Sequence, residues 1–556
     1  MSSFNITENI TLNYDGTNFI INSVNYSAPL SLQNSTEFDV TVTLNFASAV
    51  SSASHYIIVN SSNITFDGAN STINISAAGY SGLIQSIGNN AIIIQNIIVN
   101  SSPGSLMNNG GWICRENFEN CLAINCIVFG FIPNNSGGIL GANCNNCIAN
   151  NCSSFGTIAN NSGGIFGANC NNCVTNSCFS NGDIENNSGG IFGYGSINCT
   201  ANQCFSSGSI LTNSGGIFGS NCNNNALNAN CVANGCYSLG IIGNTNSYNS
   251  GGIFGVSCNS SATNSTCSAL YCFSLGYIYG DNSGGNGGIF GGNCISCTAQ
   301  NCYSIGLIGT SSGGIFLTST NGEALYCYSI GSISTLAGGI FSMSCSDCSA
   351  ISCYTVGNID SQAGGIFGSQ SNNCSAQFCY SLGNANTAAG SIFGSSSTNS
   401  TCTSCYVLHG LTSNLFGNGS SNTTIINCIA ENGGSWDDVY AQATIANSNS
   451  QWISVLSNTP FLLESFNNSN FQNLSPYGYQ YTYVIPNNLT ITENGIKTYL
   501  FLTGYYKQSQ KNYSSNIYGY LFANYSITVN LSELNKIPII FNITKNMKQE
   551  LNYIFP

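Results

Sequence analysis

The sequence predicts an all-β protein, a right-handed parallel β-helix of about 26 residues per coil with a small C-terminal β domain. Residues 135–147 read NSGGILGANCNNC and residues 161–173 read NSGGIFGANCNNC, so the two segments differ at one position. The Ile after the glycine pair recurs ten times from Ile139 to Ile392, at intervals of 25 or 26 residues except for two of 36. Short apolar bursts alternate with Asn, Ser and Gly, and no helical period is present. A fixed period of this length is typical of stacked coils.

Stacking explains why the repeat is uniform and poor in charge. Parallel coils lie about 4.8 Å apart, so each side chain sits on its own copy in the next coil. Ile packs on Ile, and Asn side chains hydrogen-bond to one another along a ladder. Like charges at that spacing repel each other, which fits a chain in which 5% of residues are charged. In each of the two 36-residue units we expect two inserted loops. One adds six residues ahead of the last cysteine, and the other adds four residues ahead of the next glycine pair.

The last cysteine of the unit recurs in all ten units, which predicts a buried ladder of small apolar side chains. The ladder residues are Cys152, Cys178, Cys204, Cys236, Cys272, Cys302, Cys327, Cys353, Cys379 and Cys405. An aromatic residue follows this cysteine in nine of the ten units, as Phe179, Phe205, Tyr237, Phe273, Tyr303, Tyr328, Tyr354, Tyr380 and Tyr406. If the cysteine points inward, this row is a candidate surface stripe for stacking on sugars or on a neighbouring rod. The alternative is a bend that turns both residues into the core.

Pairs of cysteines with two residues between them (Cys-x-x-Cys) are the only pattern that suggests a metal. They are Cys144/Cys147, Cys170/Cys173, Cys294/Cys297, Cys345/Cys348 and Cys402/Cys405. A zinc site needs four converging ligands, whereas the members of stacked columns are spread along a rod. We therefore predict no metal and no cofactor. Disulfides between adjacent coils are geometrically allowed, and the odd count of 29 leaves at least one thiol unpaired.

The segments GGIFG and NCYSIG (residues 301–306) resemble the GLUG-type repeat of bacterial surface proteins and adhesins, and related β-helix proteins of giant DNA viruses. The resemblance covers about residues 134–428 and implies a β-helix with a structural or adhesive role. The start, MSSFNITENITLNYDG, lacks the pattern of a signal peptide, and no apolar run is long enough to span a bilayer. We therefore expect the surface of a virion or other extracellular particle, without membrane insertion.

The composition predicts five segments along the chain. They are an N-terminal cap (1–54), irregular opening coils (55–134), the regular β-helix (135–430), a closing cap with a short helix at Trp436–Ile445 (431–475), and a Tyr-rich β domain (476–556). Residues 497–556 hold six lysines against two glutamates. A basic end on an acidic chain predicts self-association, as a homo-oligomer or filament, through the C-terminal domain.

The lack of basic residues excludes nucleic acid as a partner, and the scattered acidic residues argue against catalysis. From Glu116 to Gly495 there is no Lys or Arg, so the bulk of the chain cannot neutralise phosphates. The acids are isolated and share no column: Asp183 and Glu185 lie in one unit, and Asp281, Glu323, Asp347 and Asp360 in others. Glycan cleavage needs clustered carboxylates. We predict a structural or adhesive protein that is not an enzyme. The alternative is a glycan-binding or polysaccharide-degrading β-helix of pectate-lyase-like type.

Overall fold

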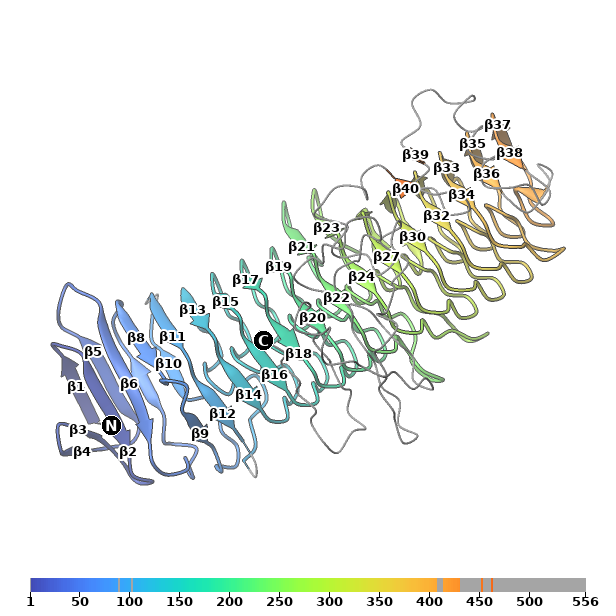
Figure 1. The fold of residues 1–556 in the computed structure, drawn as a ribbon. Coiled ribbons are helices and arrows are strands. Elements are labelled where there is room, and N and C mark those ends of the chain that lie inside the picture. The colour runs from blue at the N-terminus through green and yellow to red at the C-terminus, as the bar shows by residue number, and fades with distance from the viewer. Residues whose placement is uncertain are drawn as a thin grey trace, which may run out of the picture. The chain divides into compact units, whose positions relative to one another are not determined.

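A computed structural model describes residues 2–88, 91–101, 104–407 and 414–430, together with the antiparallel pair β39 (Trp452–Ile453) and β40 (Leu462–Leu463). The chain divides into two compact units, Met1–Ala430 and Glu431–Pro556. The first unit is a parallel β-solenoid whose coils follow one another along one axis (Figure 1). The described residues contain no α-helix, and therefore none that could cross a bilayer. The predicted helix at Trp436–Ile445 and the Tyr-rich domain lie outside the described residues.

Three sheets, one two-stranded pair and columns of isolated bridges make up the described part of the solenoid. The first sheet joins β1 (Ser2–Ile6), β5 (Leu30–Asn34), β7 (Ile57–Val59) and β10 (Ile84–Ser86). The second has 14 strands: β9 (Thr72–Asn74), β12 (Ile98–Asn100), β14 (Ile127–Phe129), β16 (Ser153–Phe155), β18 (Phe179–Ser180), β20 (Phe205–Ser206), β22 (Tyr237–Ser238), β24 (Phe273–Ser274), β27 (Tyr303–Ser304), β30 (Tyr328–Ser329), β32 (Tyr354–Thr355), β34 (Tyr380–Ser381), β36 (Tyr406–Val407) and β38 (Ile429–Ala430).

The third sheet begins with an antiparallel turn of the chain and continues as parallel strands. Its strands are β2 (Ile10–Tyr14), β3 (Asn18–Ile21), β4 (Val24–Ser27), β6 (Val40–Phe46), β8 (Ile64–Asp67), β11 (Ile92–Gln95), β13 (Cys121–Ile124), β15 (Ile148–Asn150), β17 (Val174–Asn176), β19 (Thr200–Asn202), β21 (Asn230–Asn234), β23 (Thr266–Leu270), β26 (Cys297–Gln300), β29 (Glu323–Leu325), β31 (Ser349–Ile351), β33 (Ser375–Gln377), β35 (Thr401–Thr403) and β37 (Thr424–Ile426). One further pair is β25 (Cys294–Ile295) with β28 (Ser319–Thr320). The hairpin β2–β3–β4 blocks continuation of this sheet at its first coil.

Equivalent residues of successive coils pair in register, as the sequence predicts. The amide of Ile165 donates to the carbonyl of Ile191 at 3.1 Å, and Val174 pairs with Thr200. The Phe column that begins at Phe166 and runs to Phe416 stacks its rings 4.7 to 5.1 Å apart. The predicted all-β fold and its spacing of about 26 residues are therefore confirmed.

Asparagine is abundant because it serves both the bends and the ladders. Asn135, Asn161, Asn187 and Asn213 occupy equivalent positions with φ between 61° and 62°. Asn tolerates this left-handed region better than other non-glycine residues. The side chains also link the coils, since Asn161 Nδ2 donates to Asn135 Oδ1 at 3.1 Å and Asn213 Nδ2 donates to Asn187 Oδ1 at 3.2 Å. Two of these bends therefore contribute a side-chain hydrogen bond along the stack.

The interior of each regular coil is divided in two at a constriction, which we call the waist, where two walls of the coil come into contact. On one wall lies the glycine pair and on the other the inward Ser of the 14-stranded sheet, where a Cβ on Gly164 would come 2.7 Å from Cβ of Ser180. The main core, with Ile165 and the ladder cysteines, lies on one side of this contact. A second core, the column of isoleucines from Ile132 to Ile359, lies on the other side. Gly and Ser recur because only small residues let the two walls meet.

Substitution of Gly190 by Ala should destabilise the solenoid. A Cβ there would overlap the Gly216 carbonyl of the next coil and come 2.8 Å from Cβ of Ser206 on the facing wall. We expect a penalty of about 1–3 kcal/mol or more and a lower thermal midpoint by circular dichroism. The control is Gly292→Ala, because the atoms nearest to that Cβ belong to the Asn249 side chain, which can move. Equal midpoints for the two variants would contradict the tight waist.

Candidate functional site

The buried isoleucine column is flanked on the outside by two rows of residues. Each column Ile pairs with its equivalent in the next coil, and the residues before and after it flank it on the outside, although Gly243 and Gly309 are buried. From the coil of Ile242 to that of Ala385, the upstream row is Ile241, Tyr277, Leu307, Ser332, Asn358 and Asn384. The downstream row is Gly243, Tyr279, Gly309, Ser334, Asp360 and Asn386. We call these two rows the Ile-column face.

The C-terminal half of the Ile-column face is a shallow polar groove of about 460 Å³. Its walls are Ser332, Ser334, Asn358, Asp360, Asn384 and Asn386, and its floor is Ile333, Ile359 and Ala385. The Thr335 hydroxyl donates to Asp360 Oδ2 at 3.2 Å, which orients that carboxylate. Hydroxyl, amide and carboxylate groups together can donate and accept hydrogen bonds to a ligand rich in hydroxyls.

The N-terminal half of the Ile-column face carries a cluster of tyrosines around one carboxylate. The hydroxyl of Tyr248 hydrogen-bonds to Asp281 Oδ2 at 3.0 Å, and that of Tyr279 reaches the same oxygen at 3.4 Å. The N–H of Ser283 donates to Asp281 Oδ1 at 2.7 Å. The side chain of Tyr248 lies close to Gly284, where a Cβ would come 2.8 Å from Cγ of the tyrosine. These contacts fix both aromatic side chains.

The four-residue insertions of the two long coils build this cluster. Each insertion turns back directly after a column Ile, through the antiparallel bridges Asn244–Ser247 and Asp281–Gly284. Buried Asn286 stands where the neighbouring coil has Ser312, and its amide joins both insertions. Its Nδ2 donates to the carbonyls of Ser247 at 3.1 Å and of Tyr279 at 2.8 Å. The larger side chain at this position therefore holds the loops on the rod.

The electrostatics of the cluster keep the carboxylate charged and the phenols neutral. The pKa of Asp281 is lowered mainly by the hydrogen bond from the Ser283 N–H. Desolvation raises this pKa, and the hydrogen bond from the Tyr248 hydroxyl lowers it again. The pKa values of Tyr248 and Tyr279 are raised, first by desolvation and then by the nearby Asp281 carboxylate. At neutral pH the cluster therefore presents a fixed negative charge ringed by hydroxyl donors.

An apolar platform lies beside this cluster in the upstream row. Ile241 is 43% exposed and Leu307 is 54% exposed, with half-buried Tyr277 between them in the intervening coil. The rings of Tyr277 and Tyr279 meet edge to face, with centroids 6.0 Å apart. From the coil of Ile241 to that of Asn384 there are five coil steps, so platform and groove form one strip of about 24 Å.

The predicted aromatic stripe forms a stacked ladder along the 14-stranded sheet. Ring centroids from Phe179 to Tyr380 lie 4.7 to 4.9 Å apart with nearly parallel planes. The next residue of each strand, such as Ser180, is buried and points inward, so the rings point away from the core. The first three rings are half-buried, whereas those from Phe273 to Tyr406 are buried. A binding role for this row stays a prediction.

The ten ladder cysteines lie inside the main core with no exposed surface. Their thiols donate to backbone carbonyls, as Cys178 Sγ does to the Ala149 carbonyl at 3.3 Å. All 29 cysteines are free thiols. The thiols behave as small side chains that satisfy the carbonyls of the preceding coil.

The N-terminal coils contain His55 and Arg115, which is the one arginine of the chain. The His55 ring hydrogen-bonds through Nδ1 to the hydroxyl of Tyr14, and its carbonyl accepts from Tyr80 at 3.0 Å. The Arg115 guanidinium lies 3.7 Å from the centroid of the Tyr56 ring. Burial lowers the pKa of His55, so the ring is neutral at pH 7. These groups satisfy one another and hold the opening coils together.

One expectation about the acidic residues is wrong, namely that no two of them share a column. Glu185 and Asp360 do share a column, because each follows a column Ile. The tyrosines of the Ile-column face were missed by sequence reasoning, although the 36-residue intervals mark the coils that carry them. Loops inserted at the same point of successive coils must lie side by side, and that signal could have found them.

The family model described as Nucleoporin FG repeat region matches residues 128–238, 233–322 and 349–436, which together make up just over half of the chain. By this sequence measure, the chain belongs to the FG repeat family. All ten Phe-Gly dipeptides of the sequence lie inside the matched residues. Phe166 and its equivalents as far as Phe393 are fully buried in the solenoid, however. Most of these Phe-Gly dipeptides therefore lie in the core, whereas Phe129 is 43% exposed.

No curated protein sequence matches the chain. Solved structures of similar fold include the tailspike of E. coli bacteriophage HK620 in complex with a pentasaccharide (11% identity, TM-score 0.28, 72% of this chain and 73% of that one). Tailspike protein 3 of bacteriophage CBA120 matches at 9% identity and TM-score 0.24, over 72% of this chain and 56% of that one. The catalytic domain of a GH87 α-1,3-glucanase with nigerose matches at 12% and 0.21, over 74% and 65%. At these values the likeness extends to the β-helix fold alone.

The prediction that the protein is not an enzyme is wrong. One of the similar structures is a glucanase catalytic domain, so a fold of this kind houses catalytic sites and does not indicate a non-catalytic role. The prediction relied on acids that share no column, whereas Glu185 and Asp360 share one, in coils that are not adjacent. The match transfers no activity to this chain.

Acid should break the contact between the tyrosines and Asp281. A carboxyl whose folded pKa is lowered stabilises the fold above its ordinary pKa of about 3.9, and this contribution is lost as pH falls through the lower folded value. We expect a change in tyrosine ultraviolet difference absorbance below about pH 4 that is absent from Asp281→Asn. Identical acid profiles of the two proteins would contradict the assigned contact.

Proposed function

We propose that the protein is an adhesive β-solenoid that binds a neutral glycan along the Ile-column face. One observation carries this proposal. A tyrosine cluster fixed by Asp281 continues, in the same two rows, into a polar groove that contains Asn358 and Asp360. Aromatic rings beside amide and carboxylate groups are the chemistry that a sugar chain requires.

Sugar rings present apolar C–H faces and hydroxyl edges, and the face offers a partner for each. The ring of Tyr277, flanked by Ile241 and Leu307, provides a surface against which a C–H face can pack. Asn358 and Asp360 provide acceptors and donors for hydroxyl groups in the groove. The supporting coils are paired on both sides, so little conformational entropy is lost on binding.

The charge of the face selects neutral over acidic glycans. Residues 116–430 contain no Lys or Arg, whereas Asp281 and Asp360 lie on the face and Glu185 lies farther along its downstream row. A sugar carboxylate or sulfate would approach like charges with no cation to neutralise it. We therefore infer a ligand without acidic groups.

Display on the surface of a virion or other extracellular particle is part of the same proposal. The resemblance of the repeat to GLUG-type surface proteins supports it, and so does the absence of trypsin-type cleavage sites between Glu116 and Gly495. Self-association through residues 476–556 is proposed from their basic charge. A rod paired throughout its length would hold the glycan face at a fixed distance from its attachment.

The glycan proposal is tested on a panel of neutral and acidic oligosaccharides with the intact chain. We expect binding to neutral members only. Tyr277→Ala and Asp360→Ala should each weaken the affinity at least tenfold, which corresponds to about 1.4 kcal/mol. The same glycans are assayed for newly released reducing ends, which separates binding from cleavage.

The matched control is Tyr194→Ala. Tyr194 is also half-buried, accepts a hydrogen bond from Asn221 Nδ2 at 2.6 Å and lies outside the two rows, so its loss should leave the affinity unchanged. A panel without neutral ligands, or ligands whose affinity is the same for all three variants, would contradict the proposal.

A further inference from the structure

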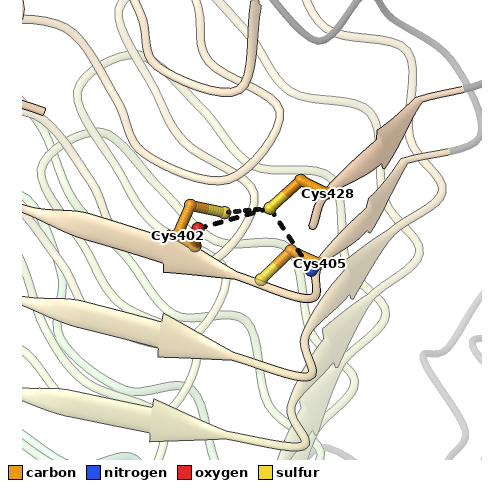
Figure 2. A group of neighbouring side chains, drawn as sticks. All are labelled: Cys402, Cys405 and Cys428. Carbon is orange, nitrogen blue, oxygen red and sulfur yellow. Dashed lines mark hydrogen bonds between the residues drawn. The ribbon is translucent and has the colours of Figure 1, made fainter. Parts of the chain in front are cut away.

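Three thiols converge in the last described coils of the solenoid (Figure 2). The Sγ atoms of Cys402, Cys405 and Cys428 all lie within 4.8 Å of one another. Cys428 Sγ lies 3.6 Å from Cys402 Sγ. Among the described residues, this is the one group of three His, Cys, Asp or Glu side chains close enough to hold a shared metal ion.

The group exists because Cys402 occupies a position at which the preceding coils have alanine. It pairs with Ala376, which pairs in turn with Ala350. Cys405 and Cys428 continue the cysteine ladder. In a regular coil the ladder thiol faces the carbonyl of this alanine, as Cys405 Sγ does at 3.4 Å from the Ala376 carbonyl. A cysteine in the alanine position adds a sulfur beside the ladder.

The cluster is also the most accessible part of the ladder. Cys428 is the one cysteine of the 29 that is not buried, whereas Cys402 and Cys405 have no exposed surface. An ion can therefore approach from the side of Cys428 and be held against two buried sulfurs. Thiolate sulfur is a preferred ligand of zinc and related soft ions.

We propose that Cys402, Cys405 and Cys428 bind one zinc ion through three thiolates, with a water or another small ligand in the fourth position. Zn–S bonds of about 2.3 Å at tetrahedral angles place sulfurs about 3.8 Å apart. The distance of 3.6 Å between Cys402 and Cys428 is close to that value. Small side-chain movements would bring all three into range.

Zinc binding would exchange protons for the ion, because each thiol must lose its proton to become a ligand. The hydrogen bond with Cys402 lowers the pKa of Cys428, but the hydrogen bond with Cys405 and burial outweigh it and raise that pKa to about 12. Without metal the Cys428 thiol therefore stays protonated at neutral pH. Loading should release protons as the ion binds.

Sequence reasoning grouped Cys402/Cys405 with four other pairs and predicted no metal. In a pair such as Cys144/Cys147, both cysteines precede the ladder cysteine of their coil, Cys152. Such pairs form no three-sulfur group in the part of the chain that the structure describes. The difference lies in the offset: Cys405 is itself the ladder residue, so its partner falls in the alanine column.

The test is zinc stoichiometry of the intact, reduced protein after metal removal and reloading. We expect one zinc per chain by elemental analysis, and a sulfur-to-cobalt charge-transfer absorption when cobalt(II) replaces zinc. Cys402→Ala restores the alanine of the preceding coils and should fold normally. It should lower zinc affinity at least tenfold and remove the cobalt band, and Cys428→Ser should act in the same way.

The control is Cys353→Ala, which removes a ladder thiol whose neighbour in the alanine column, Ala324, carries no sulfur. It should retain one zinc per chain. Circular dichroism establishes that each variant is folded before loading. A wild-type chain that binds no zinc, or a Cys402→Ala chain that binds it as tightly as wild type, would overturn the proposal.

Discussion

The structure depends on the in-register pairing of each coil with the next. Because the backbone repeats every 26 residues, every side chain meets its own equivalent about 4.8 Å away. That constraint selects the residues that can repeat. Phe stacks on Phe, Asn bonds to Asn, and the glycine pair lets the wall that carries Gly164 close on Ser180. A lysine or glutamate at such a position would repel its own copies, which explains the low charge of the rod.

Both candidate sites lie where the sequence departs from the regular repeat. The insertions of two adjacent coils place Tyr248 and Asp281 beside Tyr279 on the outside of the core. One exchange, alanine to Cys402, turns a structural ladder into a cluster of three sulfurs. In both places the regular coils act as a rigid support, and a small departure supplies the chemistry. A solenoid tolerates such changes because each coil contacts only its neighbours.

The sequence was sufficient for the fold, since a strict period and short apolar bursts leave few alternatives to a stacked coil. The inward ladder of Cys152 and its equivalents follows from the same alternation. The candidate sites were not predictable in this way. The cluster around Asp281 needs the path of two inserted loops, and the sulfur cluster needs the offset between Cys402 and the ladder. These are relations between coils, and a single unit of sequence does not reveal them. The exclusion of catalysis relied on acids that share no column, although Glu185 and Asp360 both follow a column Ile.

An experimental density map of the intact chain tests the account most directly, through the spacing of the Phe column. The stacking predicts that the rings of Phe166 and Phe192, and each later pair of equivalents, lie about 5 Å apart with parallel planes. The glycine pair of each coil should face the inward Ser of the 14-stranded sheet. A map in which these phenylalanines are separated by more than two coil spacings, or in which the register shifts between coils, would contradict the account.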